Sequence, residues 1–171
     1  NKDENITSIS IAKAIGVGAD SSVVAENGTL FAKDLLVGEA PDSTGLFAVT
    51  NGTLEVARDI IVGAGNNSDG TVLVALSSSA THAVNLGTAS NAVGRLTMVG
   101  VGTVYASELT LGDASAVNPG QGILTLAGGN LVVTGALDVA TGSYIDVTDS
   151  SSSLKWDGDF EALWNAGARR T

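Results

Sequence analysis

The sequence predicts an all-β protein, built as a right-handed parallel β-solenoid of about six three-strand coils with a short C-terminal helical cap. Three observations predict this fold: a motif that recurs about every 24 residues, short runs of alternating apolar residues, and a composition rich in turn formers. The stretch NGTLFAKDLLVG, residues 27–38, returns at 51–63 as NGTLEVARDIIVG. Such self-similarity is typical of a chain that repeats one structural unit.

The composition fits short strands joined by many turns. The 171 residues include 22 Gly, 2 Pro and no Cys, with 44% hydrophobic, 4% aromatic and 15% charged residues. A chain of this kind makes its core from Val, Leu, Ile and Ala, while Gly, Ser, Thr, Asn and Asp form the turns. Its length allows one core of ordinary size.

The clearest repeat is a strand end of the form apolar-x-apolar-Gly. Its six copies, the last with Ala in place of Gly, are Ile15-x-Val17-Gly18, Leu35-x-Val37-Gly38, Ile60-x-Val62-Gly63, Val84-x-Leu86-Gly87, Leu109-x-Leu111-Gly112 and Leu137-x-Val139-Ala140. The steps between their final positions are 20, 25, 24, 25 and 28 residues. We take each copy as the end of one strand in one coil.

Two further alternating runs keep step with this motif. The runs before it are Ile9-x-Ile11, Leu30-x-Ala32, Leu54-x-Val56, Val104-x-Ala106 and Leu131-x-Val133. The runs after it are Val23-Val24, Leu46-x-Ala48, Val72-x-Val74, Leu96-x-Met98, Leu124-x-Leu126 and Ile145-x-Val147. Each unit therefore offers three short strands of period two.

Stacking explains why the units resemble one another. One unit cannot bury its apolar face alone, whereas stacked units pair each strand with the same strand of the next coil at about 4.8 Å. The inward residues then form ladders, and six of them are expected in the core: Ile60, Val62, Val84, Leu86, Leu109 and Leu111. An antiparallel sandwich or an up-and-down barrel also has short strands, but it gives no reason for successive units to match.

We divide the chain into solenoid repeats over residues 1–148 and a C-terminal segment over 149–171 that caps the last coil or contacts another subunit. In this segment DFEALWNAG, residues 159–167, predicts a short amphipathic helix with Asp159 as N-cap and Gly167 as its end. Its apolar positions are Phe160, Leu163 and Trp164.

The charge balance argues against several partners. With 8 Lys and Arg against 18 Asp and Glu and a pI near 4.2, the chain lacks the basic surface that supplies most of the affinity for nucleic acids. No apolar run reaches the roughly 18 to 20 residues that span a membrane. The absence of cysteine leaves the compartment open.

One row of acids is the best candidate for a chemical site. Asp34, Asp59 and Glu108 each stand one residue before the strand-end motif, so a solenoid would align them on one face, with Lys33 and Arg58 beside them. A polysaccharide-degrading enzyme would need paired carboxylates of this kind. A solvated outer row that carries no chemistry is the simpler interpretation, and we expect no catalytic site.

His82 and one polar turn are two further candidate sites. His82 is the one histidine and is expected to be exposed on a solenoid face. The turn GNNSDG, residues 65–70, has oxygen-bearing side chains that could bind calcium, but its spacing matches neither the EF-hand nor the nonapeptide repeat. We therefore expect no metal site and no cofactor.

The repeats carry a family resemblance. The NGTL…VG pattern, with GGNLVVTGALDVA at 128–140, resembles the Gly-Thr-Leu strand repeats of autotransporter-like passenger regions. It also resembles the β-strand-rich surface proteins of planctomycetes and verrucomicrobia that carry a Pro-Glu-Pro sorting anchor, and DFEALWNAG resembles a segment that closes such repeats. The resemblance implies a secreted or cell-surface location.

We expect a non-enzymatic structural protein and hypothesise that it is a filament subunit that associates head to tail. An uncapped end of a solenoid is a template for another chain. The residues expected at this interface are Ile6, Ile9, Ile11, Trp156, Phe160, Leu163 and Trp164. A glycan-binding or adhesin module is the alternative, with an extracellular glycan as partner, and a polysaccharide-degrading β-helix enzyme is a weaker one.

Overall fold

The computed structural model describes residues 5–6, 9–11, 20–75, 79–100, 102–114, 117–158 and 169–170. These residues form strands and turns, and no helix lies among them. The strands are β1 (Asn5–Ile6), β2 (Ile9–Ile11), β3 (Asp20–Val37), β4 (Thr44–Val62), β5 (Asp69–Val74), β6 (Ser79–Leu86), β7 (Val93–Val99), β8 (Thr103–Leu111), β9 (Gln121–Ala127), β10 (Asn130–Val139), β11 (Tyr144–Val147), β12 (Ser153–Trp156) and β13 (Arg169–Arg170). The part of the chain so described has no helix long and apolar enough to cross a membrane. The helix expected over 159–167 lies outside it.

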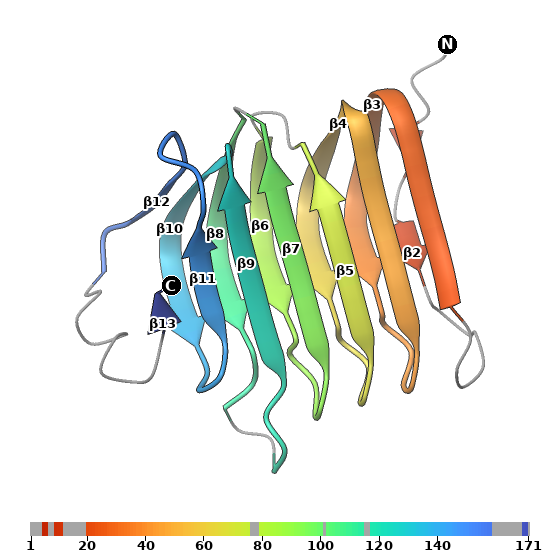
Figure 1. Cartoon of the computed structure of the whole chain (residues 1–171), viewed down its shortest axis with the longest axis vertical. Coiled ribbons are helices and arrows are strands. Elements are labelled where there is room, and N and C mark those ends of the chain that lie inside the picture. The colour runs from red at the N-terminus through yellow and green to blue at the C-terminus, as the bar shows by residue number, and fades with distance from the viewer. Residues whose placement is uncertain are drawn as a thin grey trace.

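The strands stack as a parallel β-solenoid of about five turns, which confirms the predicted fold class. Figure 1 shows two layers of strands, one in front of the other, and in each layer the strands lie side by side along the solenoid axis. The front sheet contains residues 20–26 of β3, residues 44–49 of β4, and then β5, β7, β9, β11 and β13. The back sheet contains residues 28–37 of β3, residues 52–62 of β4, and then β6, β8, β10 and β12.

The core is a set of ladders that run through successive coils. Val62 pairs with Leu86, Leu86 with Leu111, and Leu111 with Val139. All six positions expected in the core are buried, with exposed fractions of at most 1%: Ile60, Val62, Val84, Leu86, Leu109 and Leu111. The predicted register of the central coils is confirmed.

The structure has two strands in each coil of its central part, where the sequence suggested three. The run before the strand-end motif and the motif itself belong to one strand, as in β8 and β10. A shift of register separates the two halves, between Ala32 and Asp34 in β3 and between Val133 and Ala136 in β10. Such bulges bend a strand without ending its pairing, so the three-strand division was wrong.

The Asn-Gly pairs also differ from expectation. Asn and Gly were expected to form turns, but β3 and β4 each run without a break through the pairs at 27–28 and 51–52. Figure 1 shows both strands curving from the front sheet over to the back sheet. Gly28, with a φ of 98°, lets the chain bend there while its neighbours stay paired.

The N-terminal coil has a different register from the one we inferred. Residues 9–11 pair with residues 35–37 and therefore hold the strand-end position that the sequence assigned to Ile15-x-Val17-Gly18. Residues 5–6 pair with residues 31–32 in the same coil. The motif at 15–18 lies outside the described residues, and the step from Ile11 to Val37 is close to the period of the other coils.

The turns from the back sheet to the front sheet explain the recurring Gly. Gly38, Gly63, Gly87 and Gly112 all have positive φ, between 64° and 75°. Each turn then returns the chain to the front sheet at a second Gly, such as Gly70 or Gly94, whose Cα packs against backbone of the neighbouring turn. A side chain larger than hydrogen would collide with this backbone, so Gly is needed at this position of the turn. This requirement explains why Gly recurs at a similar place in successive units.

Candidate functional site at the solenoid corner

Charged side chains gather on the outer corner of the back sheet, where the strands bulge. Asp34, Arg58, Asp59 and His82 form this group, which we call the corner cluster. Asp34 follows the register shift in β3, Arg58 lies within the matching shift in β4 and Asp59 follows it, and His82 lies in β6. The bulge turns successive side chains outward, and this brings residues of three coils together.

Arg58 binds Asp34 of the preceding coil with both branches of its guanidinium group. Its Nε donates to Oδ1 at 2.7 Å and its Nη2 donates to Oδ2 at 2.5 Å. The Asp34 side chain is 11% exposed, and that of Arg58 is 53% exposed. Hydrogen bonds from Arg58 hold the pKa of Asp34 below its ordinary value, against the opposing effect of desolvation. The carboxylate is therefore ionised at neutral pH.

Asp59 connects this ion pair to the next coil. Its Oδ2 lies 3.7 Å from Nε of Arg58, and its Oδ1 lies 3.1 Å from Nδ1 of His82. The hydroxyl of Thr81, itself buried, donates to the backbone carbonyl of Arg58. His82 is exposed as expected, but its contact with Asp59 was not foreseen because pairing partners follow from the exact register.

The acid row is only partly assembled. Asp34 pairs directly with Asp59, whereas Ala83 separates Asp59 from Glu108 in the same column. General acid catalysis by a carboxyl group needs a raised pKa, and the pKa of Asp34 is lowered. The arrangement is an ion pair between two coils, extended to a third coil by the contact of His82 with Asp59.

The turn GNNSDG uses its polar groups for contacts between coils. Asn67 donates from Nδ2 to Oδ1 of Asp42 at 2.9 Å and accepts from Nδ2 of Asn91 at 3.0 Å. All three residues have positive φ, between 54° and 56°. The carboxylate of Asp69 is bound by Arg95. Among the described residues, no group of three or more His, Asp or Glu side chains is arranged to hold a metal ion.

A sequence signal for this ladder was present. Asp42, Asn67 and Asn91 stand at equivalent places in their turns, four residues after Gly38, Gly63 and Gly87. Asn and Asp tolerate the left-handed conformation better than other residues with side chains, and their side chains can bond between coils. The repeat of this position pointed to a turn ladder.

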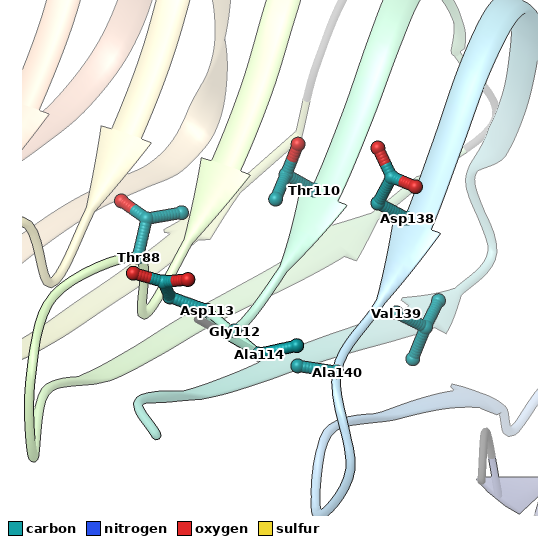
Figure 2. A pocket seen from close by; sticks show the side chains of 8 residues that line it. All are labelled: Thr88, Thr110, Gly112, Asp113, Ala114, Asp138, Val139 and Ala140. Carbon is teal, nitrogen blue, oxygen red and sulfur yellow. The ribbon is translucent and has the colours of Figure 1, made fainter. Parts of the chain in front are cut away.

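A shallow hollow lies beside the C-terminal ends of β8 and β10, and the sequence did not reveal it. Its volume is about 390 Å³, and the lining residues are Thr88, Thr110, Gly112, Asp113, Ala114, Asp138, Val139 and Ala140. Figure 2 shows Thr110 and Asp138 on neighbouring strands, with Asp113 and Thr88 on the other side of the hollow. Two carboxyl groups and two hydroxyl groups thus border one open surface.

Trp156 is the one predicted interface residue whose side chain the structure describes. It pairs in register with Val133, and its Nε1 donates to the carbonyl of Gly135 at 2.8 Å. The partly buried ring packs against the core and lies so close to Gly158 that a Cβ there would be 2.0 Å from Cζ2. Trp156 therefore covers the end of one core column.

The other predicted interface residues are placed less fully. Ile6, Ile9 and Ile11 belong to β1 and β2, whose backbones pair with β3. Phe160, Leu163 and Trp164 lie outside the described residues. Their role at an interface stays a prediction.

Comparisons of the chain with protein-family models, with curated proteins and with solved structures gave no match.

Proposed function

We propose that this chain is a secreted or cell-surface structural protein that associates head to tail into a filament, without catalytic activity. The observation that carries the proposal is the state of the terminal strands. β12 and β13 end the strand order, and each pairs with one neighbour among the described strands. At the other end, the part of the chain that the structure describes contains no partner of β1 and β2 besides β3.

Open edges of this kind favour association. A terminal strand has backbone donors and acceptors on its outer side that another chain can pair with. The core columns also have the same register from coil to coil, so a second copy can continue the stack in parallel. Contact between unlike ends does not close by two-fold symmetry and can propagate into a filament.

The corner cluster supports a structural role as well. The ion pair of Arg58 with Asp34 links two coils, Asp59 contacts His82 of the next coil, and the pKa of Asp34 is lowered as in a structural ion pair. The resemblance of the repeats to passenger regions and surface proteins supports the extracellular location.

The proposal is tested by sedimentation velocity and negative-stain electron microscopy of the full chain over a range of concentrations. We expect the mean mass to rise with concentration and rods of variable length to appear. Glu108→Gln is a matched control, since Glu108 lies in β8 with a paired strand on both sides and not at the ends of the solenoid, and this variant should assemble like the wild type. A single monomeric species at every concentration would contradict the proposal.

Glycan binding is a second candidate function, and the hollow favours it. Asp113, Asp138, Thr88 and Thr110 present carboxyl and hydroxyl groups that can hydrogen-bond sugar hydroxyls. A glycan array with the wild type and the Asp138→Asn variant separates the two functions. Binding that is lost in the variant while assembly persists would assign the hollow to a glycan. Release of reducing ends from a polysaccharide panel would instead support the hydrolytic alternative.

A further inference from the structure

The front sheet has an open edge at its N-terminal end. Residues 20–26 of β3 pair in register with residues 44–50 of β4. On the outer side of β3, β1 and β2 pair with residues 31–32 and 35–37, which belong to the back sheet. Among the described strands, the front half of β3 therefore has a partner on one side only.

The core column behind this edge is uncovered. Val23, Phe47, Val72, Leu96 and Leu124 occupy one column. Val23 is 42% exposed, whereas the other four are at most 1% exposed. An apolar side chain in a core position gains stability when a further strand covers it.

A buried hydroxyl points to the same missing neighbour. Ser21 begins the column that continues through Gly45, Gly70 and Gly94, and its Oγ is buried without a hydrogen-bond partner. At the opposite end of this column, Oγ of Ser143 accepts the N–H of Gly122 at 2.9 Å. A buried hydroxyl group without a hydrogen-bond partner destabilises the folded chain. An added strand that supplies such a partner would therefore be stabilised at this edge.

The C-terminal edge of the same sheet has complementary charge. β13 consists of Arg169 and Arg170 and pairs in parallel with Tyr144 and Ile145 of β11. Residues 20–26 contain Asp20 and Glu26 and no basic residue. β13 and residues 20–26 thus carry charges of opposite sign.

We propose that β13 of one copy lies parallel to residues 20–26 of the next copy, and that this pairing joins the subunits of the filament. This inference rests on the proposed head-to-tail assembly and adds the contact that forms it. Attraction between the arginines of one copy and the acidic residues of the next favours contact between unlike ends. Two like ends would repel each other, so charge selects the head-to-tail orientation.

Two complementary double variants test the pairing. The first is Arg169→Glu with Arg170→Glu, and the second is Asp20→Lys with Glu26→Lys. Each variant alone has two ends of like sign, and we expect half-assembly to need about tenfold more protein than for the wild type. In an equimolar mixture every contact joins opposite signs, so assembly should return. Higher salt should weaken assembly of the wild type and of the mixture.

The controls separate this inference from the proposed function. Glu108→Lys changes a charge on β8, which has a paired strand on both sides, and should leave assembly unchanged, and circular dichroism should show that every variant is folded. If the wild type assembles and both double variants assemble as well alone, the contact lies elsewhere and the inference is wrong, although the proposed function stands. A wild type that stays monomeric would overturn both.

Discussion

Asp34 and Arg58 illustrate how single residues hold neighbouring coils together. Their two hydrogen bonds span a separation of 24 residues in sequence, and both side chains leave the sheet at its bulge. A bidentate pair between arginine and a carboxylate fixes geometry better than a pair with lysine. The corner cluster therefore also fixes the register between β3 and β4.

We predict that Arg58→Met lowers the free energy of unfolding at neutral pH, and that this loss shrinks in acid. The pKa of Asp34 in the folded chain lies below that in the unfolded chain, which is about 3.9. The stabilisation is therefore complete above about pH 4 and disappears as the pH falls through the folded-state pKa. Urea unfolding of wild type and variant between neutral pH and about pH 2.5 measures the difference.

Lys33→Met is the matched control, because Lys33 lowers the pKa of Asp34 only through its charge, and less than Arg58 does. Its effect on stability should be smaller than that of Arg58→Met. A difference between wild type and Arg58→Met that does not change with pH would show that the ion pair is not its origin.

At the level of the elements, the turn glycines set the path of each coil. Gly87 has a φ of 64°, and a Cβ on it would lie 2.0 Å from the carbonyl oxygen of Gln121. Gly142 has a φ of 89°, but a Cβ there would meet nothing within 4 Å. The two positions separate the cost of backbone conformation from the cost of collision.

We predict that Gly87→Ala destabilises the solenoid more than Gly142→Ala. For Gly142→Ala the left-handed conformation alone should cost about 1–2 kcal/mol. Gly87→Ala adds a collision with backbone that cannot move without shifting the neighbouring coil, so its cost should exceed this range. Thermal and urea unfolding of both variants measure the costs, and equal values would contradict the steric explanation.

The strands could be predicted from the sequence because the alternation of apolar residues and the repetition of the strand-end motif both indicate which residues stack in one column. The runs that end at Val62, Leu86 and Leu111 were placed correctly, since each aligns with its neighbours at nearly constant spacing. The bends were missed because Thr134-Gly135-Ala136 has the composition of a turn, yet pairing with the next coil continues on both sides of it. Local composition cannot show that a ladder persists across a bulge.

The errors in the first coil and in the site have a similar origin. Ile15-x-Val17-Gly18 matches the strand-end motif letter by letter, but its step of 20 residues to Gly38 is shorter than every other step. Successive coils need a similar number of residues to go once around the solenoid. Ile9 and Ile11 therefore fit the strand-end position of the first coil better. The adjacency of Asp34 and Asp59 was predicted, whereas the contact of His82 with Asp59 and the hollow near Asp138 depend on where side chains leave the bulges.

At the scale of the whole molecule, the solenoid is nearly one-dimensional. Each coil contacts the coils before and after it, so a change in a central coil weakens two interfaces and a change in a terminal coil weakens one. Leu111 is completely buried and has a neighbour on each side in its column, Leu86 and Val139. Leu154, in β12, is only partly buried and pairs with Leu131 alone among the described strands.

We predict that Leu111→Ala lowers the free energy of global unfolding by about 2–5 kcal/mol, the usual cost of a large-to-small change in a packed core. Leu154→Ala should cost less and should act mainly on the opening of the last coil, because the coils before it remain packed without that side chain. Urea unfolding gives the global values, and native-state hydrogen exchange compares the amides of β8 with those of β12. Leu154→Ala should speed exchange in β12 while β8 keeps its protection, and Leu111→Ala should reduce protection in both. Equal loss of protection in β8 for the two variants would mean that the whole solenoid unfolds as one unit and that its ends do not open independently.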